Sequence, residues 1–185
     1  MQELTRKLIH LVFGLGIAGM LGVLDTATAT AILAGGLFFG IILVDLVLRG
    51  YRLPAISALV HYVDRSDPLP GKGALYFAIS ALTCVILFSK PVVMPALVSL
   101  AVLDGVATIA GTSCGRTRIY NGRSLEGTIA AIIITFLVLL LVMPVPGAFI
   151  VAVIAGIIEM FSPVDDNLVI PIGICILLTA VPVLL

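Results

Sequence analysis

Residues 91–112 read PVVMPALVSLAVLDGVATIAGT, an apolar stretch that contains one charged residue, Asp104. A helix over this stretch is long enough to cross the hydrocarbon core of a bilayer, which requires about 20 mostly apolar residues. The stretch therefore predicts a membrane-spanning helix with a carboxyl group inside it. An ionised carboxyl group near the bilayer centre is unfavourable by about 2.5–3.5 kcal/mol, so we expect a polar environment to compensate for Asp104.

The composition extends this interpretation to the whole chain. Of the 185 residues, 61% are hydrophobic and 11% are charged, and the mean hydropathy is +1.29. A water-soluble domain needs more charge than this to cover its surface. The ten basic and ten acidic residues cancel, so the chain offers no net positive charge to a phosphate backbone. The composition indicates an integral membrane protein and excludes a soluble enzyme and a nucleic-acid-binding protein.

Charged residues, prolines and glycines divide the chain into seven apolar segments. We predict an all-α fold, a polytopic integral membrane protein with about seven transmembrane helices in a single domain over residues 1–185. The predicted spans are 8–24, 28–48, 73–89, 91–112, 128–143, 147–162 and 168–185.

The basic residues predict how these spans are oriented. Seven crossings place nine of the ten Lys and Arg residues on one side and only Lys90 on the other. By the positive-inside rule, the N-terminus and the long loops 49–72 and 113–127 face the cytoplasm, and the C-terminus lies outside the cell membrane.

The loop 49–72 has a helical pattern of its own. Apolar residues recur there at Ile56, Leu59, Val60 and Val63, with polar residues on the other face. This spacing predicts a short amphipathic helix that lies in the cytoplasmic membrane interface.

The position of Asp104 predicts where a functional site opens. Eight residues separate it from Thr112, so it lies about 12 Å below the cytoplasmic end of its helix. It shares a helix face with Thr108 and Gly111, which indicates a polar cleft open to the cytoplasm. The alternative is a protonated Asp104 bonded to a neighbouring backbone group.

Two further groups of charged residues accompany Asp104. Arg6, Lys7 and His10 are three and four residues apart, so the first turns of the first helix present three donors on one side and predict an anion site. Alternatively, Arg6 and Lys7 only anchor the helix at the lipid headgroups. Asp45 and Arg49 are four residues apart, and they either belong to the polar site or form an internal ion pair.

The segment 111–128 combines glycines, hydroxyl groups and arginines at the predicted mouth of the cleft. Glycine lets backbone N–H groups approach phosphate oxygens, and arginine supplies paired donors. The spacing of a Walker A loop is absent. The alternative is a solvated, positively charged loop. The candidate nucleotide-binding residues are Arg6, Lys7, Gly111, Gly115, Arg116, Arg123, Ser124 and Gly127.

Acidic residues gather around the last predicted turn. Asp165, Asp166 and Asn167 precede the last span, and their oxygens suit Mg²⁺. A simple helix N-cap is the alternative, although a cap needs only one such residue. We predict a divalent metal bound by Asp104, Asp165 and Asp166. Further members of the polar site are Asp45, Arg49, Glu126, Glu159 and Asn167.

The order of these motifs resembles that of the CTP-dependent lipid-alcohol kinase family, which includes dolichol kinase, phytol kinase and a CTP-dependent diacylglycerol kinase. No single motif is specific, but the ordered set is. The matching stretches are 3–10, 45–49, 71–76, 104–115, 123–128 and 159–167 with Pro171. The chain is much shorter than the dolichol kinases, and Arg123 stands where a lysine is common in the family.

The resemblance implies transfer of the γ-phosphoryl group of CTP to the hydroxyl of a polyprenol, isoprenoid alcohol or diacylglycerol. It implies a cytoplasmic active site with a divalent metal, and the expected catalytic residues are Asp104, Lys72 and His10. Two alternatives stay open. A CTP-dependent cytidylyltransferase of the phosphatidate type attacks the α-phosphorus, but the chain lacks the C-terminal signature of that family. A small transporter commonly has internal repeats, and none is convincing here.

Overall fold

The computed structural model describes residues 2–51, 71–120 and 122–185. Within this part, the regular secondary structure is helical, with one isolated bridge between Arg118 and Ser124, which confirms the predicted all-α class. The predicted amphipathic helix falls mainly on residues 52–70 and so lies outside the described residues. The helices are α1 (Gln2–Val23), α2 (Thr26–Leu48), α4 (Lys72–Leu87), α5 (Lys90–Cys114), α6 (Leu125–Leu139), α7 (Val145–Phe161) and α8 (Asp166–Ala180), followed by the short 3₁₀ helix η1 (Pro182–Leu184).

Each predicted span coincides with one helix, but three predicted boundaries are wrong. α1 begins at Gln2, six residues before the predicted span, because its polar first turns continue the helix. α6 ends at Leu139 and not at residue 143, because the chain continues there in tighter turns, in which the N–H groups of Leu141 and Val142 bond to carbonyls three residues back. α8 ends at Ala180 and not at residue 185, because Pro182 disfavours the helical conformation at Val181.

Two of the described helices, α2 and α5, are long and apolar enough to cross a membrane. Their surroundings differ: 78% of the most apolar window of α5 is buried inside the protein, against 6% for α2. The remaining described α-helices are apolar but shorter. A long apolar helix that exposes most of its side chains is unfavourable in water, so α2 supports an association with a membrane.

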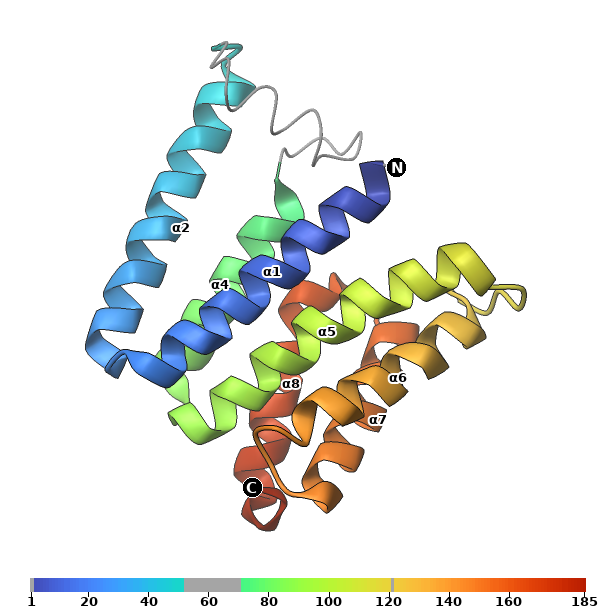
Figure 1. The fold of residues 1–185 in the computed structure, drawn as a ribbon. Coiled ribbons are helices and arrows are strands. Elements are labelled where there is room, and N and C mark those ends of the chain that lie inside the picture. Colours follow the sequence, from blue (N-terminus) through green and yellow to red (C-terminus); the bar gives the residue numbers. More distant parts are fainter. Residues whose placement is uncertain (1, 52–70, 121) are drawn as a thin grey trace.

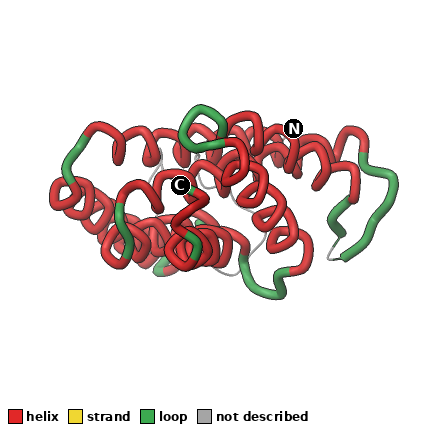
Figure 2. The backbone as a smooth tube through the Cα atoms, turned by 90° about the horizontal axis from the view of Figure 1, so that it is seen from below, coloured by secondary structure: helices red, strands yellow, loops and turns green. Residues whose placement is uncertain are grey.

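α5 lies at the centre of the helical bundle (Figure 1). It packs against α1, α4, α6, α7 and α8, and every residue from Pro95 to Gly105 is buried. α2 packs mainly against α4, at the edge of the bundle. Figure 2 shows the helices from below, joined by loops. Because α5 is enclosed, the carboxyl group of Asp104 is surrounded by other parts of the chain.

One end of the bundle brings the turn between α1 and α2 next to the turn between α4 and α5. Asp25 caps α2 and accepts hydrogen bonds from the backbone N–H of Thr28 at 2.9 Å and from its hydroxyl at 2.6 Å. These bonds hold the pKa of Asp25 below its usual value. Lys90 contacts the carbonyl of Leu24. Lys90, the one basic residue predicted to lie outside, therefore shares this end with Asp25.

Candidate functional site

Polar side chains from several helices meet at the opposite end of the bundle, near the start of α1. They come from α1, α5, α7, α8 and the loop that precedes α6. We call this group the polar cluster, and its members are Lys7, His10, Asp104, Arg123, Glu159, Asp166 and Asn167. All seven were candidates from the sequence, and the helical packing brings them together.

Lys7 and Asp104 join α1 to α5 inside the cluster. The ammonium group of Lys7 contacts Oδ1 of Asp104, and the two side chains are 13% and 4% exposed. Lys7 also lies within electrostatic range of Asp166. A buried carboxylate is strongly unfavourable without a nearby cation. Lys7 therefore provides the compensation that the sequence required for Asp104, and it comes from a different helix.

Arg123 holds two further carboxylates. Its Nη2 donates to Oδ2 of Asp166 at 2.8 Å, and its Nη1 contacts Oε1 of Glu159. The other carboxylate oxygen of Glu159 accepts a hydrogen bond from the hydroxyl of Thr128 at 3.2 Å. Glu159 and Asp166 are both buried. A planar guanidinium group can bridge two carboxylates in this way, so Arg123 connects the α6 loop to α7 and α8.

His10 belongs to a chain of hydrogen bonds at the start of α8. Its Nε2 lies 2.9 Å from Oδ1 of Asn167, and Nδ2 of Asn167 donates to Oδ1 of Asp165 at 2.9 Å. Asp165 also accepts the backbone N–H of Asn167 at 3.2 Å, so it caps α8. The N-cap alternative is therefore correct for Asp165, whereas Asp166 and Asn167 also bond to Arg123 and His10 from other parts of the chain.

The polar cluster carries more negative than positive side chains, as a site for a divalent cation requires. Among its described members, three carboxylates face two cations, Lys7 and Arg123, and Asp165 adds a further negative charge nearby. No group of three or more His, Cys, Asp or Glu side chains is arranged to bind a metal within the described ranges. Magnesium sites commonly use only one or two carboxylates, with substrate phosphates completing the shell. A divalent metal held by Asp104 and Asp166 stays a prediction.

The loop between α5 and α6 is held by Glu126. Its carboxylate accepts the backbone N–H groups of Arg116 and Thr117 at 3.1 Å and the hydroxyl of Thr117 at 2.9 Å. Glu126 precedes the predicted span 128–143, and its own backbone N–H and then Thr117 lower the pKa of its carboxyl to about 2. Arg118 donates to the carbonyl of Gly122 at 2.6 Å. Glu126 is thus charged at neutral pH and orders the loop that carries Arg116 and Arg123.

The predicted phosphate-binding glycines lie where α5 and α6 cross. A Cβ atom on Gly127 would lie 2.7 Å from the carbonyl oxygen of Ala107 and 2.9 Å from Cα of Gly111. A Cβ atom on Gly115 would lie 2.5 Å from the hydroxyl oxygen and 2.7 Å from the Cβ atom of Ser124, the residue before α6. Ser124 caps α6 by accepting the backbone N–H of Gly127 at 3.2 Å. Close packing of the two helices therefore accounts for glycine at these positions, and their role toward a nucleotide stays a prediction.

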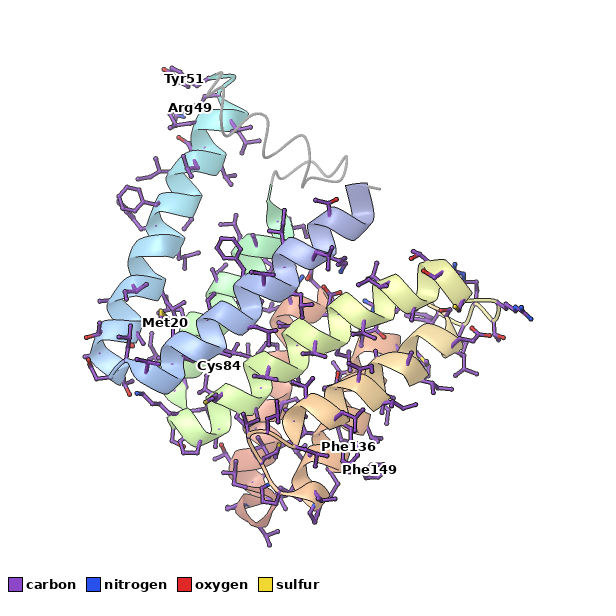
Figure 3. All side chains as sticks on the ribbon, viewed as in Figure 1. Met20, Arg49, Tyr51, Cys84, Phe136 and Phe149 are labelled. Carbon is purple, nitrogen blue, oxygen red and sulfur yellow. The ribbon has the colours of Figure 1, made fainter. Side chains whose placement is uncertain are left out.

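Some predicted site residues lie apart from the cluster. Asp45 and Arg49 form an exposed ion pair of 2.7 Å near the end of α2, as the internal-pair alternative expected, and Figure 3 places Arg49 outside the packed helices. The ammonium group of Lys72 lies 5.5 Å from the centre of the Tyr76 ring. The predicted role of Arg6 depends on a side chain outside the described part of the structure.

Two buried hydroxyl groups support the cluster and were not among the predicted site residues. The hydroxyl of Ser80 donates to the backbone carbonyl of Asn167 at 2.7 Å, and that of Thr128 donates to Glu159. Both lie inside apolar helices and are nearly inaccessible to solvent. A hydroxyl group in an apolar span is a signal for a polar neighbour, but it does not identify that neighbour.

The chain is similar to an archaeal protein. The uncharacterized protein MJ1137 from Methanocaldococcus jannaschii is 37% identical over 177 residues, which cover 92% of this chain and 90% of that protein. No family model and no solved structure matches the chain.

Proposed function

Because the chain belongs to the same family as the uncharacterized Methanocaldococcus jannaschii protein, whose name states no activity, we propose its function from the polar cluster itself. We propose a lipid-alcohol kinase that transfers the γ-phosphoryl group of CTP to the hydroxyl of a polyprenol, another isoprenoid alcohol or diacylglycerol. The reaction takes place at the cytoplasmic face of the cell membrane, and Mg²⁺ assists it.

The observation that carries this proposal is the convergence of three buried carboxylates, two cations, a histidine and an amide in an otherwise apolar bundle. Each buried charge is unfavourable, so a structural role would be served better by apolar side chains of similar size. Phosphoryl transfer needs positioned charges of both signs more than it needs a covalent nucleophile. A site of this composition at the end of an apolar bundle therefore suits a phosphate donor and a lipid acceptor.

The basic side chains of the cluster and its surroundings bind the triphosphate, and two of its carboxylates bind the metal. Lys7, Arg123 and the exposed Arg116 neutralise the triphosphate. Arg6, the neighbour of Lys7 in the sequence, and Lys72, the first residue of α4, act with them. Asp104 and Asp166 hold Mg²⁺, which neutralises charge on the phosphate oxygens when bound. For this, Lys7 and Arg123 shift from their carboxylate partners toward the phosphates.

The lipid acceptor reaches the cluster from the bilayer. α1 carries the cluster residues Lys7 and His10 on one face and the exposed apolar residues Val12 and Phe13 on another, with exposed fractions of 68% and 69%. An apolar tail can lie against such a surface while its hydroxyl group stops at the depth of Asp104. The length of that tail distinguishes polyprenols, phytol and diacylglycerol as substrates.

The proposed topology has seven crossings, with the N-terminus and the polar cluster on the cytoplasmic side and the C-terminus outside. Its support is that α1, α4, α6 and α8 begin at the cluster end, that Lys90 lies at the other end, and that the sequence pattern assigns the remaining nine basic residues to the cytoplasmic side. The two long apolar helices are long enough to span the bilayer, and the five shorter ones cross it where the bilayer thins around the bundle and flanking polar side chains reach the interface.

Thiol labelling in sealed vesicles tests this topology. Cys84 and Cys175 are buried, whereas Cys114 at the end of α5 is exposed and serves as an internal reference. Val164→Cys adds a thiol to the turn between α7 and α8, and Leu141→Cys adds one to the turn between α6 and α7. We expect an impermeant maleimide to label Cys114 and Val164→Cys from the same side, and Leu141→Cys from the other. Labelling of Cys114 and Val164→Cys from opposite sides would exclude a shared site.

The activity itself is tested by a screen of nucleotides and acceptors. Purified protein is incubated with γ-labelled nucleoside triphosphates and Mg²⁺ in mixed micelles that contain a polyprenol, phytol or diacylglycerol. We expect label in one class of lipid, with CTP as the best donor. A transporter would label no lipid under any of these conditions and would instead support solute flux in vesicles without nucleotide.

A further inference from the structure

The hydrogen-bond chain from Asp165 through Asn167 to His10 has a fixed direction. A carboxylate only accepts hydrogen bonds, and Asp165 receives two N–H groups from Asn167, at 2.9 and 3.2 Å. The amide nitrogen of Asn167 must therefore face Asp165, and its oxygen must face His10. Since that oxygen accepts from the ring at 2.9 Å, Nε2 of His10 carries a hydrogen. A neutral ring then has its free lone pair on Nδ1.

The surroundings hold both side chains in this arrangement. The ring of His10 packs edge to face on Phe77, with centroids 5.4 Å apart and planes at 84°. The hydroxyl of Ser80 fixes the backbone carbonyl of Asn167 at 2.7 Å, and Asn167 is 7% exposed. The imidazole is thus positioned in a defined orientation before any substrate binds.

The first turn of α4 approaches the ring with a glycine. A Cβ atom on Gly73 would lie 3.9 Å from Cε1 of His10 and 3.5 Å from Nδ2 of Asn167, which is ordinary van der Waals contact. Cε1 is bonded to both ring nitrogens, so there is space about the size of a methyl group at this edge of the ring. A small group such as the hydroxymethyl end of a lipid alcohol fits a space of that size.

His10 bonds to a neutral group, whereas the carboxylates of the cluster contact cations. Asp104, Glu159 and Asp166 each contact a cation, which makes them poor proton acceptors. The described partner of His10 is a neutral amide oxygen, and the amide leaves Nδ1 available. The ring is thus the base in the cluster whose accepting atom is not already neutralised by a cation.

We propose that His10 is the proton acceptor for the lipid alcohol and that Asn167 and Asp165 are positioning residues that fix its protonation at Nε2. This inference rests on the proposed kinase function. As the alcohol oxygen forms its bond to the γ-phosphorus of CTP, its proton passes to Nδ1 of His10. The bond between the γ-phosphorus and the bridging oxygen breaks, and its electron pair leaves with CDP. The imidazolium then carries the proton until it is released to solvent.

The protonation pattern can be measured without activity. The chain has two histidines, His10 and His61, so His61→Gln leaves one ring for ¹⁵N spectroscopy of histidine-labelled protein in lipid nanodiscs. In mildly alkaline solution, we expect a protonated Nε2 and an unprotonated Nδ1. Asp165→Ser keeps a hydroxyl cap on α8 but removes the carboxylate, and we expect both tautomers in this variant. A ring protonated at Nδ1 in the parent protein would overturn the inference.

The catalytic role is tested with His10→Gln. Its amide can keep an N–H donor near the position of Nε2, but it has no nitrogen at the position of Nδ1. We expect kcat for lipid phosphorylation to fall about 10²–10⁴-fold with the KM for CTP unchanged. Full activity of His10→Gln beside an active wild type would overturn the proton-acceptor role and leave the kinase function intact. Absence of transfer by the wild type would overturn both, whatever the spectroscopic result.

Discussion

Arg123 and Asp166 are 43 residues apart in the chain, and Nη2 of the arginine donates to Oδ2 of the aspartate at 2.8 Å. The same guanidinium group contacts Glu159. This relationship ties the loop before α6 to the end of α7 and the start of α8. Arg123 therefore holds Glu159 and Asp166 in the same polar cluster, so substitutions of Arg123 test both the fold and the site.

Arg123→Gln is expected to destabilise the protein. It leaves the buried carboxylates of Glu159 and Asp166 without their cation, which costs about 3–5 kcal/mol when one partner of a buried ion pair is removed. Arg123→Lys keeps the charge and should lose less. The measurement is equilibrium unfolding in detergent micelles. Arg116→Gln, at an exposed position in the same loop, is the matched control, and equal stability of the two Gln variants would contradict this account.

Asp104→Asn is expected to abolish turnover while the protein remains folded and extractable. The substitution preserves side-chain size, and the amide oxygen that it introduces can still accept a hydrogen bond from Lys7. Activity should fall because a magnesium ligand is lost. Transfer of label from γ-labelled CTP and size-exclusion chromatography of the same sample measure the two effects. Full activity in this variant would refute the role of Asp104.

The double variant Lys7→Met/Asp104→Leu separates stability from activity. Apolar side chains of similar size often replace a buried ion pair without loss of stability, whereas Asp104→Leu alone leaves Lys7 unpaired. We therefore expect the double variant to be more stable than Asp104→Leu and equally inactive. Recovery of activity in the double variant would show that the pair is structural and not catalytic.

Gly127→Ala is expected to disturb the crossing of α5 and α6. The added Cβ atom would lie 2.7 Å from the carbonyl oxygen of Ala107, a backbone atom that moves only with its helix. Overpacking of this kind typically costs about 1–3 kcal/mol. Gly19→Ala is the control, because a Cβ atom there meets nothing within 4 Å. Thermal unfolding of both variants in micelles measures the difference, and equal melting temperatures would contradict the packing role.

Asp45→Asn is expected to change little. Its ion pair with Arg49 joins side chains that are 55% and 67% exposed, and such pairs at helical spacing contribute about 0.3–0.5 kcal/mol or less. We expect unchanged lipid phosphorylation and a stability close to that of the wild type. A large loss of activity in this variant would place Asp45 in the site after all.

The sequence predicted the position of each helix because apolar length and proline are local signals. It failed at the ends of α6 and α8: the apolar run continues past Leu139, where the backbone changes to tighter turns, and past Ala180, where Pro182 ends the helix. It also predicted all members of the polar cluster, since a charged residue in an apolar span is conspicuous. The partners could not be predicted, because Lys7 and Asp104 are 97 residues apart and only the packing of α1 on α5 joins them.

For the glycines of segment 111–128, the sequence leaves two different roles open. Gly111, Gly115 and Gly127 lie in a segment that also contains hydroxyl groups and arginines, and this composition suggested phosphate binding. In the structure, Gly111 and Gly127 let the backbones of α5 and α6 approach closely, and Gly115 leaves room for the side chain of Ser124. Sequence alone does not distinguish a glycine that approaches a phosphate from one that approaches another helix, because both require only the absence of a side chain.

The most direct test of the proposed kinase compares the two ends of the triphosphate. Purified protein is incubated in parallel with CTP labelled at the γ-phosphorus and at the α-phosphorus, together with Mg²⁺ and either a lipid alcohol or phosphatidate in micelles. The proposal predicts labelled lipid from the γ-labelled CTP alone. Labelled lipid from the α-labelled CTP would instead identify a cytidylyltransferase, and unlabelled lipid in both reactions across the acceptor panel would contradict the assignment as a CTP-dependent enzyme.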